Sequence, residues 1–443
     1  MNFRTNIAFR KESLAKLLHV ILSKEDAILQ ALYDDFKKPA FESLITETNF
    51  VISDLKHTIK NLDSWARPKS VLPALLNFPS NDFICHDAYG KVLIIAPWNY
   101  PFHLALCPLI AAVAAGNQVV LKPSELTPHT SSVIAGLIAE SFHPDHVTVV
   151  EGGVAVAQEL LSQRWDYIFF TGSVPVGKIV AKAAAEFLTP VTLELGGKSP
   201  CIVHGSASLQ LTAKRIVWGK FLNAGQTCIA PDYLLIHRSV KPKFIEYLKQ
   251  EIVLAYGGNP ETSPDFARII NPKNWQRLCG LLKDGTIVHG GQSTEQDCFL
   301  APTLVDEPSL ASALMTDEIF GPLLPMLAYE TEADIAGILS RYEKPLSLYV
   351  FATDKEFIAA MLRDHSFGGG CVNDVVIHLN NKRLPFGGVG HSGMGASHGK
   401  HGFDTFTHNK SIVRRANWLD LPARYAPYAG KLKSIRKLLK WLW

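Results

Sequence analysis

The sequence predicts an α/β protein whose core is an open, mostly parallel β-sheet with helices on both faces. The first observation is a stretch of thirty residues, 92–121, without any Asp, Glu, Lys or Arg. It fits a buried strand at 92–96, a buried helix at 104–115 and a second buried strand at 118–121. The second observation is that strand-like and helix-like segments keep alternating after it, which is typical of a doubly wound sheet.

Length and composition narrow the class of protein. A chain of 443 residues exceeds the size at which one hydrophobic core stops growing, so we expect two or three domains. The net charge of +3 is too balanced for a nucleic-acid-binding surface. Seven cysteines without CxxC spacing indicate a reducing compartment, and hence a cytoplasmic protein without a disulfide framework or zinc site.

The remaining elements follow from hydrophobic periodicity. Leu and Ile recur at helical spacing over the first 67 residues, and three prolines between positions 68 and 79 then lead to a short strand at 82–86. Prolines and polar residues interrupt the uncharged stretch, which excludes a membrane span there. Further elements are expected as helices from about 130, at 155–163, from 176, near 213, at 243–255 and at 332–340, and as strands at 147–151, 167–170, 191–195 and 233–236 and near 303, 324 and 348.

The segment 221–231 is the most informative one for function. It places Cys228 among small and polar residues directly after a predicted helix. Gly225 permits a left-handed backbone, so a tight turn can present the thiol and the backbone N–H of Cys228 to one substrate atom. A single cysteine is more often a small buried apolar residue, and the other motifs decide between the two interpretations.

Two side chains elsewhere complement a nucleophilic thiol. Asn99 follows the buried strand at 92–96, and its amide N–H can stabilise an oxyanion. Glu194 lies at the end of the strand at 191–195, where apolar surroundings raise the pKa of a carboxyl and suit it to act as a general base. Taken singly, Asn99 equally fits a turn-stabilising residue and Glu194 a surface carboxylate.

Strand ends in the first half of the chain fit a dinucleotide. Lys122 and Glu125 follow a buried strand and can bind ribose hydroxyls. Gly172 permits close backbone approach, and Ser173 at a helix N-terminus can receive a phosphate. Residues 172–178 also match G-x-x-x-x-G-K, but a nucleotide triphosphatase is disfavoured because Ile follows where Ser or Thr binds magnesium.

Seven motifs in order resemble the NAD(P)-dependent aldehyde dehydrogenase superfamily over nearly the whole chain. Residues 229–233 and 393–406 are similar to its class 3 branch, which includes the fatty aldehyde enzymes. The motifs are Pro97-Trp98-Asn99, Lys122-Pro123-Ser124-Glu125, Phe170-Thr171-Gly172-Ser173, Glu194-Leu195-Gly196-Gly197-Lys198, Gly225-Gln226-Thr227-Cys228, Glu318-Ile319-Phe320-Gly321-Pro322 and Pro385-Phe386-Gly387-Gly388.

The resemblance implies a catalytic role for three residues. Cys228 attacks the aldehyde carbonyl, and Asn99 together with the Cys228 backbone N–H holds the oxyanion of the thiohemiacetal. Oxidation leaves a thioester, and Glu194 activates the water that hydrolyses it to the carboxylic acid. The branch suggests a medium- or long-chain aliphatic or an aromatic aldehyde.

The resemblance also implies the cofactor contacts. NAD or NADP is expected, with Lys122 and Glu125 at the adenosine ribose; Glu125 disfavours a 2′-phosphate and Lys122 offsets it. The remaining implied contacts are Gly172 and Ser173 at the pyrophosphate, Glu318 and Phe320 at the nicotinamide ribose, and Trp98. No metal is expected, and His391, His398 and His401 are interpreted as structural.

An aldehyde dehydrogenase fold implies three parts. A Rossmann-like cofactor-binding domain is expected at 1–78 and 89–203, and an α/β catalytic domain at 204–408. Alternatively, the end of the segment 204–408 belongs to the cofactor-binding domain. A bridging oligomerisation arm is expected at 79–88 and 409–443, with a homodimer as the implied assembly.

The last segment of the chain is strongly basic. Residues 410–443 carry nine Lys or Arg against one acid, and residues 431–443 have the spacing of an amphipathic helix. This helix either packs on the partner subunit, lies near the substrate entrance, or makes peripheral contact with a membrane surface. It is too short and too charged to span a bilayer.

Two alternative functions remain at this stage. A coenzyme A-acylating semialdehyde dehydrogenase shares the chemistry, but such relatives generally lack a base at the position of Glu194. A non-catalytic structural or membrane-surface protein would reuse the fold, and the joint presence of Cys228, Glu194 and Asn99 argues against it.

Overall fold

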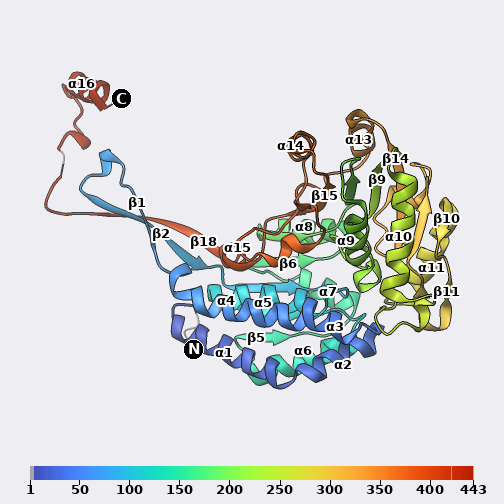
Figure 1. The fold of residues 1–443 in the computed structure, drawn as a ribbon. Coiled ribbons are helices and arrows are strands. Elements are labelled where there is room, and N and C mark those ends of the chain that lie inside the picture. The colour runs from blue at the N-terminus through green and yellow to red at the C-terminus, as the bar shows by residue number, and fades with distance from the viewer. Residues whose placement is uncertain (1–3, 421, 443) are drawn as a thin grey trace. The chain divides into compact units, whose positions relative to one another are not determined.

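The computed structural model describes residues 4–420 and 422–442 and divides the chain into two compact units. The larger unit comprises Met1–Trp65 and Ala88–His408, and the smaller one Ala66–Asp87 and Asn409–Trp443. Each unit is assembled from segments that are far apart in the sequence. Figure 1 shows the helices and strands of the larger unit, which include a six-stranded and a seven-stranded sheet.

The N-terminal segment is helical, as its periodicity predicts. Asn6 caps the first helix by accepting a hydrogen bond from the backbone N–H of Phe9. Apolar faces of the first and fourth helices pack together, and the fourth also contacts α5 (His103–Ala115). The elements are α1 (Ile7–Ser23), α2 (Glu25–Phe36), α3 (Ala40–Ser43), a π-helical turn (Leu44–Thr48) and α4 (Asn49–Trp65).

The first sheet has six strands in the order β17-β7-β6-β3-β4-β5, and all neighbours are parallel except β17 and β7. From β3 the chain proceeds outward through β4 and β5 and then returns to the other side of β3 with β6. The carboxyl ends of β3 and β6 therefore meet at a topological switch point, where open α/β sheets bind ligands. The elements are β3 (Lys91–Ile95), β4 (Gln118–Lys122), α6 (Pro128–Ser141), β5 (Val147–Val149), α7 (Val154–Leu161), β6 (Tyr167–Thr171), α8 (Val174–Glu186), β7 (Val191–Glu194) and β17 (Gly393–Met394).

Burial explains the uncharged stretch of the sequence. Val92, Leu93 and Ile94 of β3 have no exposed surface, and α5 is apolar on nearly all sides because it lies inside the unit. Gly116 ends α5 with a left-handed residue (φ 95°), after which β4 begins.

The second sheet has seven strands in the order β10-β13-β14-β9-β8-β15-β16. Its strands are parallel except β10, which runs antiparallel to β13. Its elements are β8 (Pro200–Val203), α9 (Leu209–Phe221), β9 (Tyr233–His237), α10 (Lys241–Tyr256), α11 (Pro272–Leu281), β10 (Thr286–His289), β13 (Thr303–Asp306), α12 (Ala313–Thr316), β14 (Leu323–Tyr329), α13 (Glu332–Leu339), β15 (Ser347–Phe351), α14 (Lys355–Asp364) and β16 (Gly369–Val372). A separate two-stranded sheet is formed by β11 (Ser293–Thr294) and β12 (Phe299–Leu300), and α15 (Gly399–Thr405) contacts α4 and α5.

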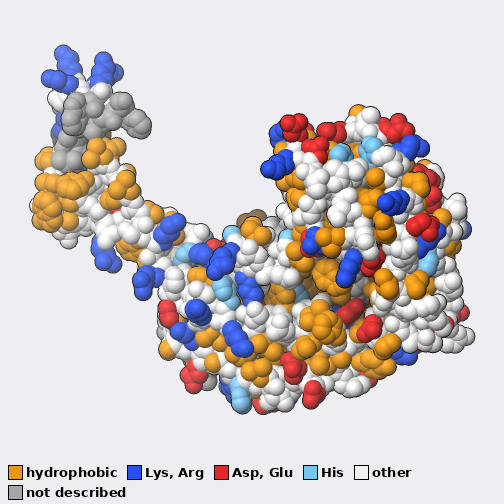
Figure 2. Space-filling view, viewed as in Figure 1, with side chains coloured by type: hydrophobic (Ala, Val, Ile, Leu, Met, Phe, Trp, Pro, Cys, Tyr) orange, Lys and Arg blue, Asp and Glu red, His pale blue; other side chains and the backbone are white. Residues whose placement is uncertain are grey.

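The smaller unit contains a three-stranded sheet and the C-terminal helix. Its sheet has the order β1-β2-β18, with β1 (Lys69–Val71), β2 (Ser80–Ala88) and β18 (Thr407–Arg415). Hydrophobic side chains gather on its exposed surface, among them Leu72 and Phe78 (Figure 2).

The predicted C-terminal amphipathic helix is present as α16 (Leu432–Leu442). The apolar stripe expected for it includes Leu438 and Leu442, and these two side chains, together with those of Trp441 and Trp443, lie outside the described part of the structure. A search of the described helices finds none with the length and apolar character needed to cross a membrane.

A buried ion pair joins the N-terminal helices to α5. Lys38 Nζ donates to Glu47 Oε1 at 2.7 Å, and both side chains are completely buried. Glu47 Oε2 accepts the backbone N–H groups of Phe102 and His103, at 3.1 and 2.8 Å, where α5 begins. One carboxylate therefore satisfies a buried cation and the N-terminus of the central helix.

We expect Glu47→Ala to lower the free energy of unfolding by about 3–5 kcal/mol, because Lys38 would remain buried without its counter-ion. Urea unfolding followed by tryptophan fluorescence measures the loss. The control is Asp63→Ala, which breaks the exposed Lys11–Asp63 pair and is expected to cost less than about 1 kcal/mol. Equal losses of unfolding free energy in the two variants would show that the buried Lys38–Glu47 pair stabilises the protein no more than an exposed pair does.

Candidate active site

Cys228 follows a backbone turn in an uncommon conformation. Helix α9 ends at Phe221, and in the short 3₁₀ segment Leu222–Gly225 that follows, Asn223 and Ala224 both have positive φ angles, 55° and 52°. Gly225 is also left-handed (φ 75°), and a Cβ atom there would lie 2.3 Å from the carbonyl oxygen of Gly321. Left-handed non-glycine residues cost energy, so the surrounding structure must hold this turn in place.

Buried hydrogen bonds hold the turn. The backbone N–H of Asn223 donates to Glu42 at 3.0 Å, and its side-chain amide donates to the carbonyl oxygen of Asn99 at 2.8 Å. The Gln226 side chain donates to the carbonyl of Arg268 at 2.9 Å and accepts from the N–H of Ile270 at 3.0 Å. Both amides are inaccessible to solvent, so they fix the backbone on either side of Gly225.

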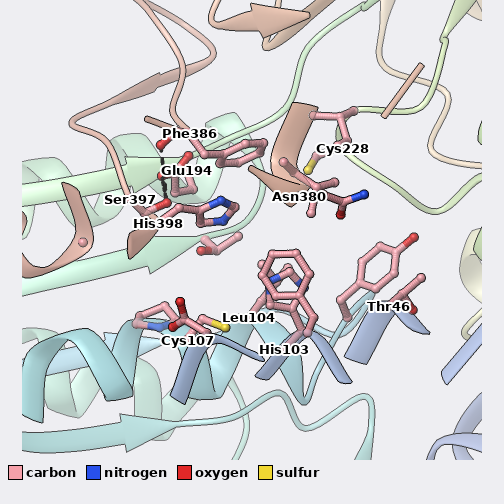
Figure 3. A pocket seen from close by; sticks show the side chains of 18 of the residues that line it. Thr46, His103, Leu104, Cys107, Glu194, Cys228, Asn380, Phe386, Ser397 and His398 are labelled. Carbon is pink, nitrogen blue, oxygen red and sulfur yellow. Dashed lines mark hydrogen bonds between the residues drawn. The ribbon is translucent and has the colours of Figure 1, made fainter. Parts of the chain in front are cut away.

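Glu194 ends β7 and faces the same cavity as Cys228 (Figure 3). Its Oε1 accepts a hydrogen bond from Ser397 Oγ at 2.9 Å, whereas Oε2 is buried without a partner among the described residues. Burial raises the pKa of Glu194 to about 8, and the Ser397 hydrogen bond opposes that rise. Near neutral pH this carboxyl is poised to exchange a proton with a group in the cavity.

The thiol of Cys228 is held in its neutral form. Burial raises its pKa well above the usual range, and the Glu318 and Glu194 carboxyls raise it further. Backbone hydrogen bonds from Cys228 and Ile229 oppose the rise. The thiol therefore needs a nearby base before it can react as a thiolate.

Asn99 is tied to the turn that carries Cys228. Its amide Nδ2 donates to the carbonyl of Gln226 at 3.1 Å, and its side chain is buried. Because an amide nitrogen carries two hydrogens, a second N–H is left for another acceptor. Asn99 is not among the described residues that line the cavity of Cys228 and Glu194.

The residues predicted to bind the adenosine half of a dinucleotide lie at the switch-point edge of the first sheet. Lys122 Nζ donates to Glu125 Oε2 at 2.8 Å, and Glu125 is partly exposed. Gly172 follows β6 and donates its N–H to the carbonyl of Glu194 at 3.0 Å. Ser173 precedes α8 but makes no side-chain cap hydrogen bond, so the N–H groups of the first turn stay available to an anion.

Of the residues predicted near the nicotinamide, Trp98 and Phe320 contact each other and Glu318 acts on Cys228. The Trp98 and Phe320 rings meet edge to face with centroids 5.3 Å apart, and Phe320 has a positive φ of 51°. Glu318 is buried and influences the thiol of Cys228 electrostatically; its own pKa is raised to about 8, chiefly by burial. The Glu318 carboxylate lies 2.1 Å from where a Cβ of Gly196 would be, so a glycine is required there.

The cavity itself has a volume of about 210 Å³ and is mostly apolar, with aromatic side chains on its walls. Sequence reasoning missed several of its residues, among them Ser397, the partner of Glu194. Tyr100 and Thr227 also line it and share a hydrogen bond of 2.7 Å. His398, which had been interpreted as structural, lines the cavity as well. Among the described residues no cluster of His, Cys, Asp or Glu suits a metal ion.

A doubly wound sheet beside a cavity that brings together a buried thiol and a buried carboxyl is typical of an oxidoreductase. The sequence model of the Aldehyde dehydrogenase family matches residues 3–412, and the chain belongs to this family. The family prediction is thereby confirmed.

Individual relatives agree with the class 3 branch. The chain is 47% identical over 437 residues to 4,4′-diaponeurosporen-aldehyde dehydrogenase of Staphylococcus aureus, covering 98% of this chain and 95% of the relative. It is 41% identical over 437 residues to aldehyde dehydrogenase family 3 member H1 of Arabidopsis thaliana, and the match covers 97% of this chain and 90% of that relative.

Solved structures show the same fold. The substrate-bound state of Staphylococcus aureus AldH matches with a TM-score of 0.96 and 46% identity, covering 99% of this chain and 96% of that one. A Mycobacterium tuberculosis aldehyde dehydrogenase complexed with NAD⁺ matches with a TM-score of 0.85 and 26% identity, and the match covers 94% of this chain and 87% of that one. The predicted α/β aldehyde dehydrogenase fold is confirmed.

The environment of Cys228 predicts its reactivity toward iodoacetamide. Above about pH 9 the Glu318 and Glu194 carboxyls are ionised and suppress the thiolate, so we expect Glu318→Gln to speed alkylation of Cys228 by roughly threefold to tenfold. At pH 6.5 both carboxyls are protonated, so the two proteins should react alike. Mass spectrometry of the Cys228 peptide measures the rate.

The control for this experiment is Glu330→Gln, because Glu330 is an exposed carboxylate paired with Arg238. It is expected to leave the alkylation rate unchanged at both pH values. A Glu318→Gln rate that equals the wild-type rate at pH 9.5 would refute the electrostatic coupling to the thiol.

Proposed function

We propose that the protein oxidises a long, apolar aldehyde to the carboxylic acid with NAD or NADP, through a covalent adduct on Cys228. The observation that carries this proposal is that the Cys228 thiol and the unpartnered Oε2 of Glu194 face one apolar cavity. The Staphylococcus aureus relative is named for 4,4′-diaponeurosporen-aldehyde, which supports an extended apolar substrate.

In the proposed reaction the Cys228 thiol releases its proton to solvent and Sγ bonds to the aldehyde carbon, so that Glu194 stays available for the later hydrolysis. The developing oxyanion accepts hydrogen bonds from the second N–H of the Asn99 amide and from the backbone N–H of Cys228. The turn at Asn223–Gly225 fixes both donors before the substrate arrives, so little reorganisation is needed at the moment of reaction.

Hydrolysis of the resulting thioester requires a water molecule and a base. Glu194 takes a proton from that water, whose oxygen then attacks the acyl carbon, and the Cys228 thiol is released. Ser397 orients the carboxylate through Oε1, so Oε2 is the oxygen left for the water. The apolar walls exclude other water molecules from the cavity.

The residues present fit a dinucleotide, which when bound supplies the acceptor for the hydride that leaves the aldehyde carbon. Lys122 and the partly exposed Glu125 would bind the adenosine ribose, and Gly172, Ser173 and the uncapped start of α8 the pyrophosphate. Trp98, Glu318 and Phe320 would hold the nicotinamide end. An NAD⁺ complex among the similar structures and a relative named dimeric and NADP-preferring in Rattus norvegicus support NAD or NADP.

The two sheets support the proposed division of labour. The first sheet and its helices, which lie within 1–78 and 89–203 except for β17, would bind the cofactor. The second sheet, which begins with β8 at Pro200 and continues within 204–408, would carry the catalytic turn. Segment 393–405 contributes β17 to the first sheet, in line with a return of the chain to that domain. Segments 79–88 and 409–443 would form the arm of a homodimer, with α16 at the partner, the substrate entrance or a membrane surface.

We expect Cys228→Ser to lower aldehyde-dependent formation of reduced cofactor by at least about a thousandfold, because a serine hydroxyl is a far poorer nucleophile here. Cofactor binding, measured by quenching of tryptophan fluorescence, should stay within about twofold of wild type. Cys279→Ser is the control and should retain full activity. Substantial turnover by the Cys228 variant would end the covalent mechanism.

We expect Glu194→Gln to slow steady-state turnover by about 10²–10⁴-fold while a burst of one reduced cofactor per enzyme persists. Deprotonated Glu194 is the active base, so the wild-type rate should rise as pH increases through about 8, and the variant should lose that rise. Stopped-flow absorbance at 340 nm measures the burst. Loss of the burst, or an equal effect of the exposed control Glu186→Gln, would contradict the assignment.

A further inference from the structure

We propose that the cavity recognises a hydroxyl group on the aldehyde substrate, at a site formed by Asp54 and Lys382. This inference rests on the proposed function and specifies the substrate further: an aldehyde with an apolar body and a hydroxyl away from the carbonyl. Asp54 and Lys382 line the cavity together with Cys107. Figure 3 shows Cys107, Leu104 and His103 of α5 together on the wall of the cavity opposite Cys228.

Asp54 is a buried carboxylate that the protein leaves without a partner. Its side chain belongs to α4 and is only 7% exposed, and it lines the cavity. Among the described residues it accepts no hydrogen bond and forms no ion pair within 4.0 Å, and only burial and the charge of Lys382 act on its ionisation. A carboxylate in such surroundings costs free energy until it meets a donor.

The nearby cation is held by another residue. Lys382 Nζ donates to Ser53 Oγ at 2.7 Å, and its charge opposes the rise that burial causes in the pKa of Asp54, although the two groups form no ion pair within 4.0 Å. Lys382 also lies over the ring of Phe50, 5.9 Å from its centroid. Asp54 and Cys107 affect the ionisation of Lys382, so the three side chains form one cluster.

The two charges select a neutral group that both donates and accepts. A ligand ammonium would be attracted by Asp54 but repelled by Lys382, and a ligand carboxylate would meet the opposite difficulty. A hydroxyl can donate its hydrogen to the Asp54 carboxylate and accept a hydrogen from the Lys382 ammonium. Both hydrogen bonds involve a charged partner, which makes them stronger than bonds between neutral groups.

Aromatic rings provide the apolar surface along the cavity. The centroid of the Phe50 ring lies 4.0 Å from that of His103 and 5.7 Å from that of His398. The His398 ring stacks on that of Phe386, with 4.9 Å between their centroids. Burial lowers the pKa of His398 to about 4 and that of His103 well below its usual range, so both imidazoles are neutral in the working enzyme. An apolar chain therefore meets uncharged rings beside the cluster of Asp54 and Lys382.

The test compares ω-hydroxyalkanals with n-alkanals of equal carbon number, from six to twelve carbons, as the full-length enzyme oxidises them. The wild type is expected to prefer the hydroxyaldehyde at one or two chain lengths, with a kcat/KM ratio of about tenfold or more. Asp54→Leu should reduce that ratio to about one or below, and Lys382→Met should reduce it by several-fold. Most of the change is expected in KM, because the hydroxyl is remote from the reacting carbon.

Asp54→Asn retains the volume of the side chain and serves if the leucine variant does not fold. Its amide oxygen still accepts a hydrogen bond but carries no charge, so the ratio should fall by about threefold. The matched control is Asp63→Asn on the exposed side of the same helix, which should keep the wild-type ratio.

The outcomes separate this inference from the proposed function. Oxidation of n-alkanals without a preference for hydroxyaldehydes at any chain length would overturn the hydroxyl site alone. An unchanged ratio in both Asp54 variants would overturn it as well, since the preference would then arise elsewhere. Failure of the wild type to oxidise any aldehyde of either series would instead contradict the proposed function.

Discussion

The site depends on one constraint, the left-handed backbone turn at Asn223–Gly225 that precedes and positions Cys228. Asn223 and Ala224 occupy a backbone region that non-glycine residues rarely adopt, and Gly225 packs against the carbonyl of Gly321 with no space for a side chain. Hydrogen bonds from three distant parts of the chain hold the turn, through Glu42, Asn99 and Arg268. The cost of the conformation is thus offset by a buried polar network that also holds the Asn99 amide beside the turn.

The buried carboxyls give the resting site a neutral character. Burial raises the pKa values of Glu194 and Glu318 to about 8 and also raises the pKa of the Cys228 thiol, so all three groups are mostly protonated near neutral pH. A neutral thiol reacts slowly with oxidants and alkylating agents, so its burial protects Cys228 from both.

Local features of the sequence were sufficient to predict much of the fold. Strands β3 and β4 and helix α5 match their predicted ranges within one or two residues, because an uncharged stretch with a glycine stop has few alternatives. The four-residue strand β8 was not anticipated, because Pro200–Val203 is too short for a periodic signal. In the cavity, Ser397 was missed because it reaches Glu194 only through tertiary folding. Asp54 was missed because a lone acid in an amphipathic helix resembles a solvated residue.

The hydrogen bond between Ser397 and Glu194 joins residues 203 positions apart, and β17 pairs with β7 over a similar separation. A ribosome must therefore synthesise nearly the entire polypeptide before the edge of the first sheet can close and the base acquire its partner. Until then the nascent enzyme exposes an unpaired strand edge at β7, which makes this edge a natural point for chaperone contact or aggregation during biosynthesis.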